Sequence, residues 1–192
     1  MTEKKLQGTK TEQNLVNAFA GESQARNRYS YFAKQAKNEG YEQIAEIFLL
    51  TAENEKEHAK LFYEPLGDIR GRVDAEYPFE FGTTEENLKS AINGEKEEWS
   101  KLYPEGERVA REEGFDDIAE IFHNVIEAEK HHDARYSKLL ENIKNGTVFS
   151  KEKEVNWMCR ECGYVFKGKS APEKCPNCHH PRAYFQILCE EY

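Results

Sequence analysis

Two Glu-x-x-His pairs stand 74 residues apart in this chain of 192 residues, at Glu55/His58 and Glu129/His132. In an α-helix, positions i and i+3 lie on one face, so each pair directs a carboxylate and an imidazole toward a common point. A separate glutamate precedes each pair by 33 or 34 residues, Glu22 for the first and Glu95 for the second. Four inward-facing helices that supply Glu, Glu-x-x-His, Glu and Glu-x-x-His are the ligand pattern of a two-metal carboxylate site.

The surroundings of these four glutamates argue against an ordinary solvated surface. Each lies on a stripe of apolar residues, which on the first helix also includes Arg26. A buried carboxylate costs several kcal/mol unless a charge compensates it. One such glutamate in so acidic a chain would be taken for a surface residue, but four in phase with two histidines would not. Two divalent cations would offset the charge, and a mixed carboxylate and imidazole set favours iron or manganese.

Three further residues lie close to this pattern. Glu98 follows Glu95 by one helical turn, which makes it either a fifth inward carboxylate or a helix-surface residue. Tyr29 and Tyr103 follow Glu22 and Glu95 by two turns. They are either core aromatics without a role or donors of a hydroxyl to a ligating carboxylate.

Four cysteines near the C-terminus form the pattern Cys159-x2-Cys162-x12-Cys175-x2-Cys178. Four thiolates at this spacing can hold one tetrahedral ion, and structural zinc is the alternative to iron. Gly163 permits a tight backbone turn whose N–H groups point at sulfur and stabilise thiolate. Zinc does no redox chemistry, whereas a four-cysteine iron centre transfers single electrons. A two-metal oxidation site on the same chain therefore favours iron.

Helical periodicity predicts four long helices, over residues 11–38, 41–66, 84–113 and 115–145. Gly40 and Gly114 should end the first and third helices, and Thr83 or Thr84 should cap the third. Pro104 must kink the third helix or break its hydrogen-bond ladder.

The two halves of the helical region are internally similar. Residues 36–48 (AKNEGYEQIAEIF) align with residues 110–122 (AREEGFDDIAEIF) at the same offset of 74. A duplicated helical hairpin joined by one long crossover, here residues 67–82, is the ferritin-like topology. We therefore predict an all-α four-helix bundle over residues 1–150. Residues 151–192 are predicted to form a second domain, which is too small for a core of its own and needs a metal to hold it.

Composition excludes several classes of function. The chain is 33% charged and 38% hydrophobic, which suits amphipathic helices with solvated outer faces. The net charge of −9 and the lack of a basic patch argue against nucleic acid and anionic membranes as partners. The N-terminus lacks the apolar stretch of a signal peptide, and no run approaches a membrane span, so we expect a cytoplasmic location. In the reducing cytoplasm, Cys-x-x-Cys pairs favour metal binding over disulfide bonds.

The chain resembles the rubrerythrin family over essentially its whole length. The matching segments of the bundle are residues 20–29 (AGESQARNRY), 55–58 (EKEH), 94–98 (GEKEE) and 129–132 (EKHH). The tail over residues 157–181 resembles rubredoxin, with Trp157-x-Cys-x-x-Cys-Gly-Tyr164 and Cys175-Pro-x-Cys178. The resemblance implies a ferritin-like bundle followed by a rubredoxin-like domain of short strands and cysteine turns with an FeS4 centre.

The resemblance also implies a non-haem di-iron site in the bundle. Its ligands would be Glu22, Glu55, His58, Glu95, Glu98, Glu129 and His132. Glu55 and Glu129 would bridge the irons, and one iron would exchange Glu98 for His58 as the redox state changes. Family members act mainly as hydrogen peroxide reductases that protect cells against oxidative stress. They form dimers in which the tail of one subunit lies near the bundle of the other.

The chemistry of the residues agrees with this resemblance. Two ferrous ions can supply the two electrons that reduce a peroxide to water, and a four-cysteine iron can return them one at a time. The chain has no glycine-rich nucleotide fingerprint, so the electrons must come from a separate NAD(P)H-dependent reductase or a rubredoxin. Two alternatives remain: a ferroxidase or iron-storing ferritin relative that uses O2, and a one-electron carrier whose bundle only supports the tail.

Overall fold

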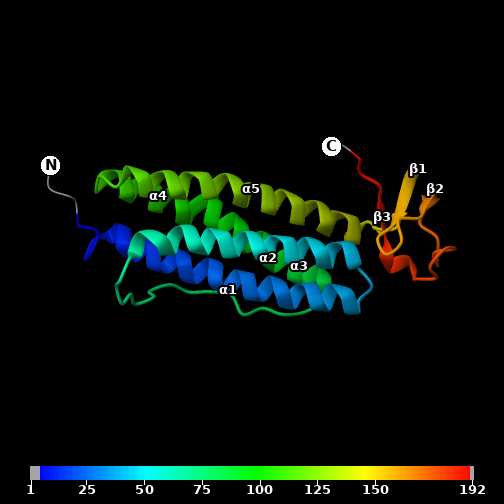
Figure 1. Ribbon diagram of the computed structural model, residues 1–192, viewed down its shortest axis with the longest axis horizontal. Helices are drawn as coiled ribbons and strands as arrows, with labels where there is room; N and C mark the ends of the chain where they lie inside the picture. The colour runs from blue at the N-terminus through cyan, green and yellow to red at the C-terminus, as the bar shows by residue number, and fades with distance from the viewer. Residues whose placement is uncertain (1–4, 191–192) are drawn as a thin grey trace.

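A computed structural model describes residues 5–190 of the chain. Long helices lie side by side in a bundle, and a small domain of strands is attached at one end of it (Figure 1). The helical elements are α1 (Lys10–Asn38), α2 (Glu42–Tyr63), η1 (Glu64–Leu66), α3 (Thr84–Glu97), η2 (Glu98–Leu102), α4 (Tyr103–Glu112) and α5 (Asp116–Lys144). The small domain contains β1 (Ser150–Cys159), β2 (Val165–Ser170), η3 (Arg182–Tyr184) and β3 (Phe185–Ile187).

The two helical hairpins turn in the same way, as the internal repeat predicts. Gly40 after α1 has φ +80° and Gly114 after α4 has φ +72°, a left-handed conformation that glycine adopts at little cost. The N–H of Tyr41 then donates to the carbonyl of Ala36 at 2.9 Å, and Phe115 donates to Ala110 at 2.8 Å. These six-to-one hydrogen bonds satisfy carbonyls that the helix end leaves open.

The third helix is interrupted where Pro104 was expected to disturb it. The interruption is η2, a π-helical turn in which the N–H of Tyr103 donates to the carbonyl of Glu98. Proline has no N–H, so the ladder must change register around it, and a π-turn keeps the axis continuous while it does so. At the other end, Thr83 caps α3 in a capping box with Glu86.

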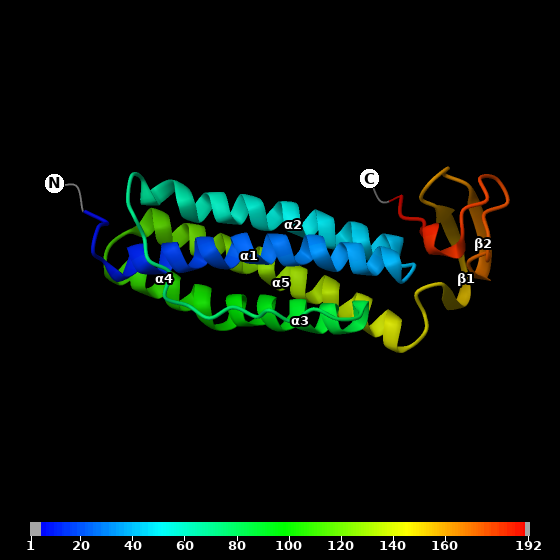
Figure 2. The ribbon, with the colours of Figure 1, turned by 90° about the horizontal axis from the view of Figure 1, so that it is seen from below.

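The crossover between α2 and α3 runs along the outside of the bundle, over α1 and beside α3 (Figure 2). Asn17 of α1 holds it in place: its amide donates to the carbonyl of Asp74 at 3.0 Å and accepts from the N–H of Asp74 at 3.0 Å. The hydroxyl of Tyr77 donates to the carbonyl of Asn17 at 2.7 Å. The segment therefore covers one face of the bundle without forming a helix or strand.

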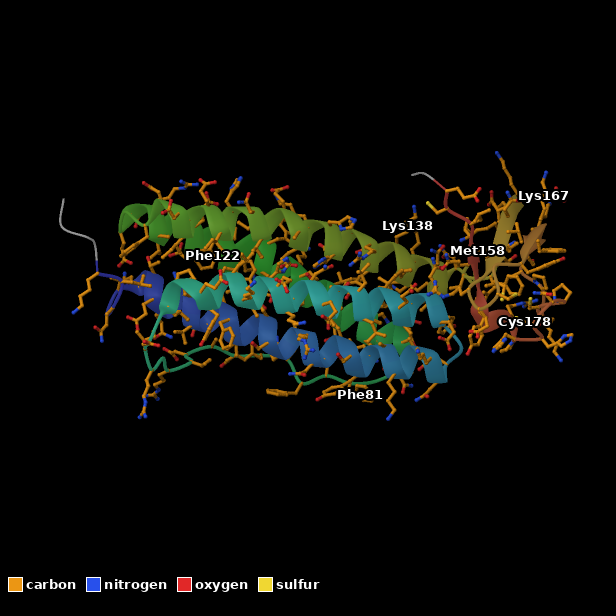
Figure 3. All side chains as sticks on the ribbon, viewed as in Figure 1. Phe81, Phe122, Lys138, Met158, Lys167 and Cys178 are labelled. Atoms are coloured by element: carbon orange, nitrogen blue, oxygen red, sulfur yellow. The ribbon has the colours of Figure 1, made fainter. Side chains whose placement is uncertain are left out.

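The bundle has two apolar clusters of buried residues. One includes Phe32 and Phe48, and the other includes Phe62 and Phe122. Figure 3 shows Phe122 within the bundle and Cys178 in the small domain beyond its end. Glu22, Glu55, Glu95 and Glu129 are buried too, at 0–1% exposure, although they belong to neither cluster.

The small domain is a three-stranded antiparallel sheet in the order β2-β1-β3. Its own core is slight: Trp157, Cys159, Ala171, Cys175 and Phe185 are its buried members. It packs against the start of α2, where the rings of Tyr41 and Phe149 stack with centroids 6.2 Å apart and Arg160 pairs with Glu46.

The predicted fold class is confirmed, with small corrections. The second helix ends at Tyr63 and not at Leu66, because Pro65 lies in the tighter turn η1. The strand β1 begins at Ser150. Among the described helices, none has the length and apolar character needed to cross a membrane.

Candidate metal centres

The two Glu-x-x-His pairs and the two single glutamates meet at one place inside the bundle. Their ligand atoms form two overlapping groups, each with all atoms within 4.8 Å of one another. The first group is Glu22, Glu55, His58 and Glu129, and the second is Glu55, Glu95, Glu129 and His132. Each helix supplies its residues because i and i+3 share a face that the apolar stripe turns inward.

Glu55 and Glu129 belong to both groups, and each presents one oxygen to each histidine. The Nδ1 of His58 lies 2.9 Å from Oε2 of Glu55 and 2.8 Å from Oε1 of Glu129. The Nδ1 of His132 lies 3.2 Å from Oε1 of Glu55 and 2.7 Å from Oε2 of Glu129. Glu22 reaches only the first group and Glu95 only the second. This arrangement suits two ions with two shared carboxylates and one terminal carboxylate each.

The charge of the cluster requires cations. Oε2 of Glu22 and Oε2 of Glu95 are buried and have no hydrogen-bond partner within residues 5–190. Burial, followed by repulsion from Glu129, raises the pKa of Glu22 well above its ordinary value and that of Glu95 to about 8. Unpartnered carboxylate oxygens and neutral imidazoles are what divalent iron binds, so the residues present fit a di-metal centre.

The pKa values of the two histidines are raised as well, but by a different cause. Burial alone would lower their pKa values, but hydrogen bonds to Glu129 and Glu55 outweigh it. The pKa of His58 rises to about 10 and that of His132 to about 12. Protons and metal cations therefore compete for the same atoms in this cluster.

The two tyrosines donate to ligating carboxylates, each across to the other hairpin. The hydroxyl of Tyr103 donates to Oε1 of Glu22 at 2.5 Å, and that of Tyr29 donates to Oε1 of Glu95. Both rings are almost completely buried. Burial and the adjacent carboxylate raise the pKa of each tyrosine well above its ordinary value, so both remain hydrogen-bond donors.

Glu98 lies outside both ligand groups of the described residues. It opens the π-turn η2 and lines a cavity of ≈ 740 Å³ between α1, α3 and the crossover. Burial, then repulsion from Glu95 and Glu129, raises its pKa well above the ordinary value. The structure thus places His58 among the candidate ligands and Glu98 outside both groups.

Sequence reasoning misplaced one arginine of α1. Arg26, expected on the inward stripe, has a side chain 40% exposed and lies 3.6 Å from Glu53. Arg28 is the buried arginine, at 9% exposure. The side chain of Arg28 packs over the rings of Tyr29 and Phe32, an interaction that helical periodicity alone does not reveal.

The four cysteines form a second, separate site. Their sulfur atoms lie within 4.8 Å of one another. The N–H of Gly163 donates to the carbonyl of Cys159 at 2.9 Å, and that of His179 donates to Cys175 at 3.0 Å. Both of these turn residues have positive φ, +74° for Gly163 and +66° for His179. The two pairs of cysteines therefore stand on matching backbone turns.

Hydrogen bonds to the sulfur of Cys162 favour its thiolate, the form that binds a metal. The side chain of Asn177, followed by the backbone of Tyr164, lowers the pKa of Cys162 to about 6. The Nδ1 of His180 lies 3.3 Å from the sulfur of Cys178. Within the described residues, His179 and His180 are not among the ligand atoms of this group.

Comparisons with known proteins match both the bundle and the tail of the chain. The model of the Rubrerythrin family matches residues 13–140, and the model of its rubredoxin-like domain matches residues 157–186. The chain belongs to the rubrerythrin family. Its bundle site binds two non-haem irons and its four-cysteine site binds one. The ligand sets of both sites fit these metals.

Several relatives are similar over nearly their whole length. Rubrerythrin of Clostridium perfringens is 51% identical over 98% of this chain and 100% of its own. Rubrerythrin of Nitratidesulfovibrio vulgaris is 46% identical, covering 96% of this chain and 97% of its own. A solved structure of nigerythrin in a mixed-valent state superposes with a TM-score of 0.64 at 34% identity, over 97% of this chain and 90% of that one.

Proposed function

We propose that this oxidoreductase is a peroxidase that reduces hydrogen peroxide to water and so protects the cell against oxidative stress. The observation that supports it is the pair of overlapping ligand groups that share Glu55 and Glu129, on the same chain as a four-cysteine site. When bound, the iron pair supplies the two electrons that one peroxide needs. Its seven ligands would be Glu22, Glu55, His58, Glu95, Glu98, Glu129 and His132.

The protein's own groups hold the ligands and supply protons. Tyr103 and Tyr29 hold the carboxylates of Glu22 and Glu95 through their hydroxyls. Glu98 lines the cavity, and burial raises its pKa well above the ordinary value, which favours the protonated carboxyl. A carboxyl in that position can donate the proton to an oxygen of the departing water and take one back from solvent.

We further propose that electrons reach the bundle through the four-cysteine iron from an external rubredoxin or NAD(P)H-dependent reductase. Tyr41, beside the small domain, precedes Glu55 by 14 residues of α2, on the order of 20 Å along the helix. A homodimer in which the tail of one subunit lies near the bundle of the other would shorten that separation.

Stopped-flow mixing tests the peroxidase activity directly. The anaerobically reduced protein should be oxidised much faster by hydrogen peroxide than by air-saturated buffer. The bundle site should be oxidised first, and the absorption of the oxidised four-cysteine iron should appear after it. Faster oxidation by O2 would instead favour a ferroxidase. The Glu98→Ala variant should keep the four-cysteine absorption and lose peroxide turnover; unchanged turnover would show that the reaction does not need the carboxyl of Glu98.

A further inference from the structure

A large cavity lies beside the candidate metal site. Its volume of ≈ 740 Å³ is in the range of small-molecule sites and far above the roughly 30 Å³ that one water occupies. The crossover forms its outer wall, and Glu98, Tyr29 and Tyr103 are part of its lining. Anything that enters it is therefore adjacent to the groups that contact the candidate metal ligands.

Two hydrogen-bonding groups of this lining have no partner within the described part of the chain. They are Nε of Arg28 and the hydroxyl of Ser90. Both residues are more than nine-tenths buried, with 9% and 3% exposure. A buried donor without a partner costs about 1–3 kcal/mol, and a ligand or ordered water that reaches these two groups from the cavity would offset that cost.

The position of Arg28 is fixed by its neighbours. Its Nη1 donates to Oε1 of Gln24 at 3.1 Å, and its guanidinium lies 5.9 Å from the ring centre of Tyr29 and 5.7 Å from that of Phe32. These contacts leave Nε without a hydrogen-bond partner in residues 5–190. A guanidinium donates only, and a hydroxyl both donates and accepts, so the pair suits a small molecule with oxygen lone pairs and O–H groups.

The charge of the cavity lining selects against anions. Arg28 and Lys101 are its basic residues, and the acidic ones outnumber them: Asp74, Glu76, Glu80, Glu97, Glu98 and Glu105. Such a rim lowers the local concentration of anions relative to that of neutral molecules. Hydrogen peroxide is neutral near pH 7 and carries both donors and acceptors.

We propose that this cavity is a peroxide-holding chamber, in which Nε of Arg28 and the hydroxyl of Ser90 bind neutral hydrogen peroxide before it passes Glu98 to the metal site. The proposal rests on the proposed peroxidase function and adds two binding residues to it. Neither residue belongs to the candidate ligand groups.

Thiol labelling tests the chamber without any measurement of activity. Cys189 is an exposed free cysteine outside the four-cysteine site, so it is first replaced by serine. A cysteine is then introduced into this metal-loaded Cys189→Ser protein by Ser90→Cys, and by Thr84→Cys as a matched control. Thr84 also lies on α3, and its hydroxyl is also buried and unpartnered within residues 5–190, but it is not among the residues that line the cavity.

Neutral methyl methanethiosulfonate should modify the Ser90→Cys variant at least about tenfold faster than the Thr84→Cys variant, whose thiol is reached only by local opening. The anionic sulfonatoethyl reagent should react with the Ser90→Cys variant more slowly than the neutral one. Equal rates for the two variants would overturn the chamber, and equal rates for the two reagents would overturn its preference for neutral ligands.

Peroxide kinetics test the two residues themselves. Ser90→Ala should raise the KM for hydrogen peroxide about threefold to tenfold and Arg28→Gln by tenfold or more, with kcat little changed, because both lose substrate binding. Thr84→Val should change neither constant. If Arg28→Gln fails to fold, Ser90→Ala decides. An unchanged KM in an otherwise active enzyme overturns this proposal alone, whereas a wild-type protein without peroxide turnover overturns the proposed function.

Discussion

Replacing Tyr103 by phenylalanine removes one hydroxyl that donates to Oε1 of Glu22 at 2.5 Å. Tyr103 is 3% exposed and Glu22 is 0% exposed, so water does not replace the lost donor in the native packing. Losing a hydrogen bond to a charged group costs about 1.5–3 kcal/mol. Because 1.4 kcal/mol is a factor of ten in an equilibrium constant, the iron nearest Glu22 should bind about 10- to 100-fold more weakly.

Two matched variants make this measurement specific. Tyr29→Phe removes the corresponding hydrogen bond to Glu95 and should weaken the other iron. Tyr136→Phe is the control, because Tyr136 is equally buried but its hydroxyl does not donate to a candidate metal ligand among residues 5–190. It should leave metal affinity unchanged and the free energy of unfolding unchanged or slightly higher.

Competition with a chelator measures the affinities, with the absorption of the four-cysteine iron as an internal reference. The reasoning assigns the effect to a donor on a ligating carboxylate, and not to loss of a buried hydroxyl in general. Equal loss of iron in Tyr103→Phe and Tyr136→Phe, or no loss in Tyr103→Phe, would refute it.

Three other predictions concern packing, pH and the small domain. Gly106→Ala would place a Cβ 2.7 Å from a ring carbon of Phe122, which packs 4.9 Å from the ring of Phe62, so we expect a loss of about 1–3 kcal/mol in chemical denaturation; an unchanged midpoint would contradict the packing. In the metal-free protein, Glu95 has a folded pKa of about 8 against an ordinary 4.5, so the folded state binds more protons and stability should fall as pH rises from 4.5 to 8. The pKa of His58 is about 10 in the folded state against an ordinary 6.5, so this loss of stability should continue to pH 10. Chemical denaturation of the metal-free protein measures it, and stability that rises between pH 4.5 and 10 would contradict this prediction. Cys175→Ser should release the tail metal and unfold the small domain, since its core is five buried residues. Near-ultraviolet circular dichroism should then lose the signal of buried Trp157 while the helical signal of the bundle persists, and retention of the Trp157 signal would argue against metal-dependent folding.

Much of the site was predictable because helical periodicity is local. Glu55 and His58 share a face in any regular helix, and the repeat at an offset of 74 places a second such pair on an equivalent helix. Burial of a carboxylate without a cation is costly, so the apolar stripes around these glutamates already required metal. The same logic applied to the cysteines, whose spacing indicates a single tetrahedral ion.

Other features depended on contacts between elements distant in sequence. Tyr29 was a candidate donor to some ligating carboxylate, but its partner, Glu95, lies 66 residues away on the opposite hairpin. The exchange of Arg26 for Arg28 as the buried arginine depends on which face of α1 the crossover covers. Pro104 was expected to disturb its helix, yet only the structure shows that the disturbance is a π-turn that begins at Glu98.

The sequence by itself determined which residues can bind metal, which helices carry them and which family the chain resembles, because residue type and helical phase are properties of short segments. The tertiary structure decided which oxygen of Glu55 or Glu129 faces which histidine, where Glu98 stands relative to His58, and that Arg28 and Ser90 line a common cavity. These depend on the rotation and axial offset of packed helices and on the path of the crossover. Side-chain packing throughout the bundle sets those quantities, and no local pattern contains them.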